Sequence, residues 1–300
     1  MPWVQANLQI KPELAELFED LLLASGALSV TYQDTQDQPI YEPELGTTPL
    51  WQNTTVSGLF DADNDIAIIE DYLRIAFNDQ AAGEKFPNIV FEILEDKDWE
   101  REWMKSYKPM QFGQRLWVCP SWCEPPQPQA VNLMLDPGLA FGTGTHPTTA
   151  LCLRWLDSIE LEQKTVTDYG CGSGILGVAA LLLGAQSVLA VDIDIQALQA
   201  TQTNLERNNL ASSRLASYLP EDAPDFKSDV LVANILSGPL VELAPVLKDR
   251  VKDSGLMVLS GLLANQEQDI IDAYSPWFDL QPAVEDEGWI RISGIRKHST

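Results

Sequence analysis

Helical and strand patterns alternate along residues 145–294, and this alternation constrains the fold more than any other feature of the chain. The predicted central strands are four short segments, 165–168, 187–191, 229–233 and 256–260, the last three rich in apolar residues. Helical segments lie between them, as connections between parallel strands require. The pattern predicts an α/β fold with a Rossmann-like doubly wound sheet. Two further strands, 278–284 and 289–294, are close enough in sequence to form a terminal antiparallel hairpin.

The first 94 residues follow a different pattern, in which the order β-α-β occurs twice. Alternating apolar residues mark the first strand, and apolar residues at helical spacing mark the helix after it. Two such units predict a small N-terminal ferredoxin-like α+β domain. We therefore expect an N-terminal domain over residues 1–94, a linker helix over 95–110 and a second domain over 111–300. Trp99 and Trp103 lie on one face of the expected linker helix.

The chain is strongly acidic, with 44 Asp and Glu residues, 19 Lys and Arg residues and a net charge of −25. Phosphate affinity comes from clustered cations, so direct nucleic-acid binding is not expected. Summed negative charge speeds encounters with cations, which favours a basic partner. The alternative, that the charge serves only solubility, remains open at this stage.

Cysteine and histidine are scarce. Four cysteines and two histidines in 300 residues predict neither a disulfide framework nor a metal site. The first residues lack the basic start and apolar run of a signal peptide. The apolar run 175–185 is shorter than the ~20 residues that span a bilayer. We expect a cytoplasmic protein with reduced thiols and no membrane association.

A glycine-rich turn, Asp-Tyr-Gly-Cys-Gly-Ser-Gly at 168–174, lies between a predicted strand and a predicted helix. Glycines there let a ligand lie on bare backbone near a helix N-terminus. The dinucleotide fingerprint G-x-G-x-x-G would need glycine where this chain has Ile175, which disfavours a nicotinamide-dependent oxidoreductase. Asp192 follows the next predicted strand, where a carboxylate can accept both ribose hydroxyls of a nucleoside.

This spacing of strand, Asp, GxGxG, helix, strand and Asp resembles that of class I methyltransferases that use S-adenosylmethionine. Two longer strings, 135–149 (LDPGLAFGTGTHPTT) and 234–240 (NILSGPL), resemble the bacterial methyltransferases of large-subunit ribosomal protein eleven. The resemblance covers essentially the whole chain. It implies S-adenosylmethionine as cofactor, an N-terminal substrate-recognition domain and a C-terminal domain that methylates amines, both the N-terminal α-amine and lysine side chains.

The resemblance also implies roles for individual residues. Thr149, with Thr148 beside it, would line the methionine end of the cofactor, and Gly170 and Gly172 would lie under it. Asp192 would bind the ribose. Asn234 would lie next to the transferred methyl group. Phe141 and Gly142 would belong to a flap over the cofactor.

Asn234 is the candidate catalytic residue, with the role of positioning the amine. The amine must be neutral to offer a lone pair, and an amide oxygen can hold its N–H groups without adding charge. The alternative is that Asn234 only caps the helix after it. His146 is open to two interpretations in the same way, as a base or as a helix cap. No dedicated general base is identified.

Two other functions remain open. One is a binding protein on a degenerate methyltransferase fold, which the intact glycines, Asp192 and Asn234 disfavour. A small-molecule methyltransferase would leave the N-terminal domain unexplained. A monomer is the default expectation for the oligomeric state.

Overall fold

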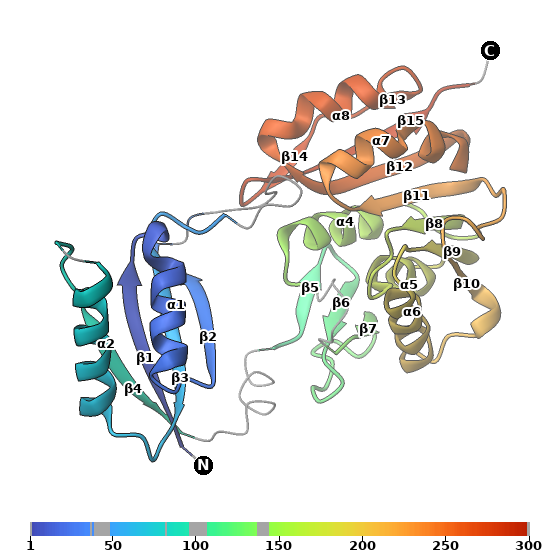
Figure 1. Cartoon of the computed structure of the whole chain (residues 1–300). Helices are drawn as coiled ribbons and strands as arrows, with labels where there is room; N and C mark the ends of the chain where they lie inside the picture. Colours follow the sequence, from blue (N-terminus) through green and yellow to red (C-terminus); the bar gives the residue numbers. More distant parts are fainter. Residues whose placement is uncertain are drawn as a thin grey trace. The chain divides into compact units, whose positions relative to one another are not determined.

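The computed structural model describes residues 2–36, 38, 49–81, 83–95, 107–136 and 144–298. The chain divides into two compact units, Met1–Met104 and Lys105–Thr300 (Figure 1). Residues 96–106 of the expected linker helix, Trp99 and Trp103 among them, lie outside the described residues. The linker and the domain boundaries therefore stay predictions.

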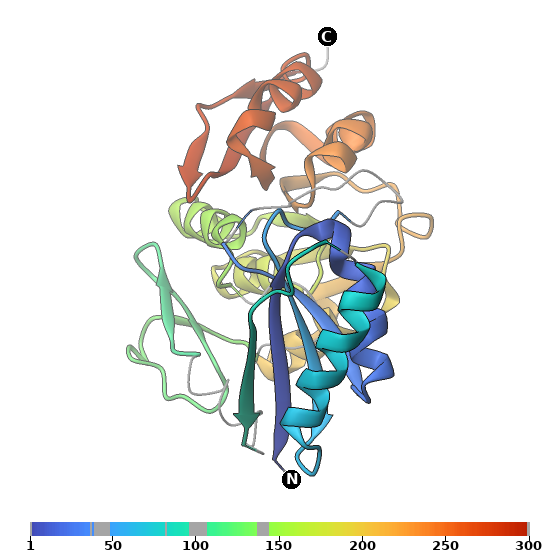
Figure 2. The same cartoon turned by 60° about the vertical axis from the view of Figure 1, so that its left-hand side comes forward.

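The N-terminal unit is one antiparallel sheet with two helices. Its elements are β1 (Trp3–Ile10), α1 (Ala15–Ala24), β2 (Ser29–Asp34), β3 (Thr54–Asp61), α2 (Ile66–Gln80) and β4 (Ile89–Leu94), with a 3-10 turn at Pro12–Leu14. The strand order is β2-β3-β1-β4, all pairs antiparallel. The order of elements and strands is that of a ferredoxin-like sheet. Figure 2 shows both helices on one face of this sheet.

The alternation in β1 explains this packing. Val4, Ala6, Leu8 and Ile10 are buried under the helices, while the residues between them are only partly covered. Phe18 from α1 and Phe77 from α2 complete the core, with ring centroids 5.2 Å apart. The period of two predicted from the sequence is thus the one that fills the core of this unit.

The second unit begins with a small sheet and continues into the large one. The first elements are β5 (Met110–Phe112), β6 (Leu116–Cys119), β7 (Val131–Met134), α4 (Pro147–Ser158), β8 (Thr165–Tyr169), α5 (Ile175–Leu182), β9 (Ser187–Val191) and α6 (Ile195–Arg207). They are followed by β10 (Leu215–Tyr218), β11 (Ser228–Asn234), α7 (Ser237–Leu247), β12 (Val251–Leu263), α8 (Glu267–Tyr274), β13 (Phe278–Leu280), β14 (Val284–Asp286) and β15 (Trp289–Arg296). Three 3-10 turns lie at Ser212–Arg214, Lys248–Arg250 and Ala264–Gln266.

The large sheet confirms the predicted doubly wound architecture. Its order is β10-β9-β8-β11-β12-β15-β13, with β14 beside β15. The five strands from β10 to β12 are parallel, and β15 runs antiparallel to β12, β13 and β14. The predicted terminal pair is present, but its first strand is split into β13 and β14 around Pro282, which has no backbone N–H to donate.

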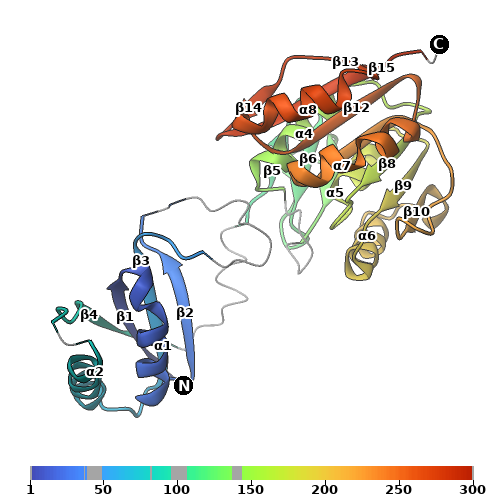
Figure 3. The ribbon, with the colours of Figure 1, turned by 45° about the horizontal axis from the view of Figure 1, so that its top comes forward.

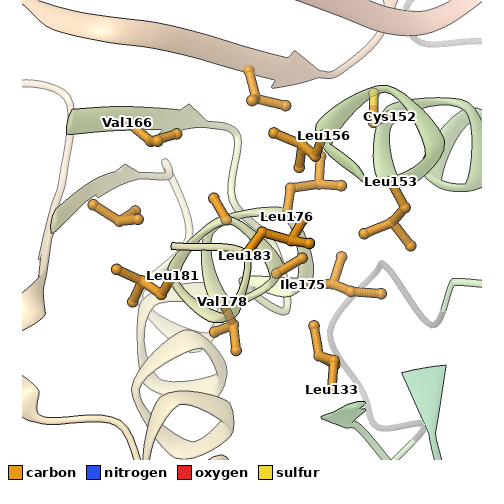
Figure 4. Close-up of a cluster of buried hydrophobic side chains, with 14 of the residues drawn as sticks. Leu133, Cys152, Leu153, Leu156, Val166, Ile175, Leu176, Val178, Leu181 and Leu183 are labelled. Atoms are coloured by element: carbon orange, nitrogen blue, oxygen red, sulfur yellow. The ribbon is translucent and has the colours of Figure 1, made fainter. Parts of the chain in front are cut away.

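Both faces of the large sheet are buried. Alternate residues of β11 point to opposite sides, so Val232 packs in one apolar cluster and Leu231 in the other. The first cluster includes α4 and α5, whose residues Leu153, Leu156 and Leu176 pack together in Figure 4. The second includes α7 and α8, which lie side by side in Figure 3. The sheet is thus a rigid core that places its strand ends.

Candidate active site

Strands β9, β8 and β11 are parallel neighbours, so their carboxyl ends meet at one edge of the sheet. From β8 the chain continues to β9 and β10 on one side and then returns to β11 and β12 on the other. This reversal is a topological switch point, the place where open α/β sheets bind ligands. Gly170, Gly172, Asp192 and Asn234 all lie at these strand ends.

The turn after β8 depends on glycine. Gly170, Gly172 and Gly174 have φ of +77°, +53° and +75°, the left-handed region that other residues adopt at a cost. A Cβ added at Gly170 would lie 2.2 Å from Cγ2 of Ile235. Glycine at this position therefore lets the turn pack directly against the residue that follows Asn234.

The Asp192 carboxylate lies against the glycine-rich turn. Its Oδ2 accepts a hydrogen bond from the backbone N–H of Gly172 at 2.8 Å, and its Oδ1 accepts one from the N–H of Asp194 at 3.0 Å. The side chain is half-buried. Each carboxylate oxygen has a second lone pair, so Asp192 can accept further hydrogen bonds from a ligand on this turn.

Asp168, the last residue but one of β8, is buried beneath the same turn, with 1% of its surface exposed. Its Oδ2 accepts a hydrogen bond from the N–H of Gly177 at 2.8 Å. Within the part of the chain that the structure describes, its buried Oδ1 has no hydrogen-bond partner. Burial raises the pKa of Asp168 to about 7; the Gly177 hydrogen bond lowers this pKa and the charge of Asp192 raises it.

The structure brings Thr149 and Asn234 together, although 85 positions separate them in sequence. Asn234 ends β11, and Thr149 lies in the first turn of α4, buried to 1% exposure. Nδ2 of Asn234 donates a hydrogen bond to Oγ1 of Thr149 at 3.3 Å. None of the described residues donates to Oδ1 of Asn234. The amide is therefore oriented by Thr149, with its acceptor atom available.

Thr148 makes a different contact from Thr149. Its Oγ1 lies 2.8 Å from Nδ1 of His146, and its backbone N–H donates to the same nitrogen at 3.3 Å. His146 is thus the N-cap of α4. Its ring packs edge-on against Trp289, with centroids 4.8 Å apart. Burial lowers the pKa of His146, and the charge of Glu287 opposes this shift. The bond that Nδ1 accepts from the Thr148 N–H makes the side chain a helix cap.

Some sequence-based expectations cannot be placed. Phe141 and Gly142 lie outside the described residues.

Among the described residues, no group of three or more His, Cys, Asp or Glu side chains could hold a metal ion. No helix within those residues is long and apolar enough to cross a membrane. Cys171 is buried, and burial raises the pKa of its thiol, so it fills space rather than acting as a nucleophile.

Helix α6 contributes two residues that the sequence patterns did not single out. Oγ1 of Thr201 donates to the carbonyl of Gly172 at 3.1 Å, and Nδ2 of Asn204 donates to the carbonyl of Ser173 at 2.8 Å. Both side chains are buried. Their signal in the sequence is the presence of polar residues three apart on the helix face that also carries buried Leu205.

Comparisons with known proteins agree along the whole chain. The model of the family described as "Ribosomal protein L11 methyltransferase (PrmA)" matches residues 2–297. Proteins of that name from Marinomonas sp. (strain MWYL1) and Shewanella sp. (strain ANA-3) are 56% and 57% identical in sequence to this chain. The alignments cover 99% of this chain and 99% and 100% of those proteins. A crystal structure of a ribosomal protein L11 methylase from Lactobacillus delbrueckii subsp. bulgaricus is 34% identical, with a TM-score of 0.58. It covers 64% of this chain and 100% of that chain.

Proposed function

This chain belongs to the ribosomal protein L11 methyltransferase (PrmA) family, and from that premise we propose that it methylates amines of ribosomal protein L11. The methyl donor is S-adenosylmethionine. The proposed acceptors are the N-terminal α-amine and lysine side chains. The observation that carries the proposal is the pairing of Asn234 with Thr149 beside the glycine-rich turn and Asp192.

The residues at the switch point fit this cofactor. S-adenosylmethionine carries a sulfonium and an ammonium cation. Two acidic side chains lie at the glycine-rich turn: Asp192, which accepts from Gly172 of the turn, and Asp168, which begins the turn and accepts from Gly177 of α5. The buried Oδ1 of Asp168 has no partner among the described residues, so the site holds acceptor capacity that the fold itself does not use. Cations satisfy such acceptors well.

The proposed contacts follow from these positions. Asp192 accepts the ribose hydroxyls, and the backbone at Gly170 and Gly172 lies under the cofactor. Thr148 and Thr149 line its methionine end. Phe141 and Gly142 contribute to the covering segment, and Asn234 lies next to the methyl group.

Asn234 positions the acceptor amine. S-adenosylmethionine supplies a methyl group already activated by its sulfonium, so the protein's task is to hold an amine lone pair in line at about 3 Å. Oδ1 of Asn234 can accept an N–H of the amine because Thr149 occupies its Nδ2. An α-amine has a reference pKa near ~8 and a lysine near ~10.4, and desolvation favours the neutral form of both.

The N-terminal unit is proposed to bind the ribosomal protein. Ribosomal proteins that contact RNA are basic, and Met1–Met104 carries 21 acidic residues but five basic ones. The same charge disfavours direct nucleic-acid binding. We also propose that the enzyme is cytoplasmic, since its substrate is assembled into ribosomes. A monomer is proposed as the default oligomeric state.

The test is methyl transfer from labelled S-adenosylmethionine to unmethylated total ribosomal protein, read by intact mass after separation. The proposal predicts label on L11, added in steps of one methyl group, with sites at the N-terminus and lysines. No label on any ribosomal protein, with cofactor binding intact, would favour a small-molecule methyltransferase. Absence of both transfer and cofactor binding would indicate a binding protein on a methyltransferase fold.

A further inference from the structure

Helix α6 carries a chain of polar contacts that begins at the glycine-rich turn. Nδ2 of Asn204 donates to the carbonyl of Ser173, and Oδ1 of Asn204 accepts from Nη1 of Arg207 at 2.8 Å. Asn204 has 6% of its surface exposed, and both ends of its amide are thus used. Because Arg207 occupies Oδ1, the amide is oriented with its NH2 group toward the turn.

The contacts continue from Arg207 to the segment after β7. Nη2 of Arg207 pairs with Oδ2 of Asp136 at 3.2 Å, and both side chains are half-buried. Asp136 also accepts hydrogen bonds from the backbone N–H and the hydroxyl of Ser121, at 2.7 and 2.8 Å. The carboxylate of Asp136 thus joins α6 to the segment after β6.

From these contacts we propose that Asn204, Arg207 and Asp136 form a positioning relay for the cofactor. The relay fixes the glycine-rich turn at Ser173 relative to Asp136, which ends the described segment after β7. The inference rests on the proposed function, because its effect is on S-adenosylmethionine affinity. None of the three residues takes part in the transfer itself, so they are positioning residues.

A separate contact holds the same region together without the relay. Oδ1 of Asn208 accepts from the N–H of Met134 at 2.7 Å, and Nδ2 of Asn208 donates to the carbonyl of Met134 at 2.9 Å. This pair of bonds ties the end of β7 to the end of α6. Loss of the Arg207–Asp136 pair therefore leaves the segment attached and changes its placement rather than its folding.

The test uses Asn204 and Asp136 because these two side chains do not contact each other directly. Arg207 contacts both and connects them. Dissociation constants for S-adenosylhomocysteine are measured by calorimetry for Asn204→Ser, Asp136→Asn and the double variant of the full chain. Each single variant is expected to weaken binding about five- to tenfold. Asn204→Ser loses two hydrogen bonds, with Ser173 and Arg207, and Asp136→Asn loses the charge of the pair with Arg207. The dissociation constant of the double variant is expected to equal that of the weaker-binding single variant, because either change breaks the same relay.

The link itself is tested in the Arg207→Gln background, where Asn204→Ser and Asp136→Asn should each add less than about twofold. The turnover number at saturating S-adenosylmethionine should stay within about twofold of the unaltered chain in all variants. A matched control is Lys252→Gln, which breaks an ion pair with Asp229 at 3.0 Å near the other end of β11 and should leave binding unchanged.

Two results would overturn the relay. One is a double variant whose fold-change in dissociation constant equals the product of the two single fold-changes. The other is a dissociation constant within twofold of the unaltered chain in every variant. Thermal unfolding of each variant separates loss of affinity from loss of folded protein. Failure of the unaltered chain to bind S-adenosylhomocysteine would contradict the proposed function and the relay together.

Discussion

At the residue scale, the proposal makes cofactor binding depend most on the Asp192 side chain. Asp192→Ala is expected to raise the dissociation constant of S-adenosylmethionine by about a hundredfold, since it removes two hydrogen bonds to a charged acceptor. Calorimetric titration measures this. The control is Asp194→Ala, which removes the N-cap of α6 but no ribose ligand. Equal binding by Asp192→Ala and the unaltered chain would show that the ribose lies elsewhere.

Asn234 should affect turnover more than binding. Asn234→Ala is expected to lower kcat for L11 methylation by about ten- to a hundredfold, because a misplaced amine loses its in-line geometry. The KM for S-adenosylmethionine should change less than kcat. Thr149→Val should show part of the same loss and Thr149→Ser little of it, since serine retains the Oγ that accepts from Asn234. Unchanged kcat in Asn234→Ala would show that Asn234 does not position the amine; a cap role is not the alternative, because the N-cap of α7 is Leu236.

Asp168 should make folding stability depend on pH. Its pKa is raised to about 7 in the folded chain, against 3.8 as the ordinary value. Between these values the folded chain holds a proton that the unfolded chain has released, so stability falls as pH rises through 7. Chemical denaturation should give about 1 kcal/mol more unfolding free energy at pH 6 than at pH 8 from this group. Asp168→Asn should lack that difference; the same pH dependence in both proteins would contradict it.

At the element scale, α4 presents Thr148 and Thr149 on its first turn, and His146 holds that turn. His146→Ala removes the cap and is expected to cost about 1 kcal/mol of stability, and to weaken S-adenosylmethionine binding as the turn frays. His146→Asn keeps a capping oxygen and should restore most of both. Denaturation and calorimetry measure the two effects. If alanine and asparagine behave alike, the cap does not position the site.

The elements that sequence patterns predicted well are those with a long or buried apolar signal. Strands β9 and β11 follow the expected ranges closely, because each carries a run of apolar residues. Strand β8 also lies where it was expected, directly before the glycine-rich turn. Strands β5 and β10 were not predicted, since three and four residues are too few for a period to show. The split of the last hairpin was also missed, although Pro282 marks it.

The chain order placed Gly170 and Asp192 at strand ends, where the structure has them, whereas Asn234 came from the family resemblance. The pairing of Asn234 with Thr149 was not predictable, because it depends on where α4 packs against the sheet. The same holds for Arg207 and Asp136, whose contact arises from tertiary packing. Spacing along a sequence carries no information on such distances until the elements are assembled.

At the scale of the whole molecule, the negative charge is unevenly distributed. The unit Met1–Met104 carries 21 acidic and five basic residues, and Lys105–Thr300 carries 23 and 14. Screening acts over ~10 Å at 0.1 M salt, so association with a basic protein should slow as salt rises. The KM for L11 is expected to increase several-fold between 0.05 and 0.3 M NaCl at nearly constant kcat. Steady-state kinetics measures both, and a KM that does not depend on salt would exclude electrostatic steering.

The central claim is that the carboxyl edge around β8 holds the methyl donor and presents it to an amine at Asn234. A crystal structure of the full chain with S-adenosylhomocysteine tests this most directly. The account predicts ribose hydroxyls within hydrogen-bond distance of the Asp192 carboxylate, the nucleoside on the glycine-rich turn and the sulfur next to Asn234. A bound molecule away from that turn, or one whose sulfur lies far from Asn234, would contradict it.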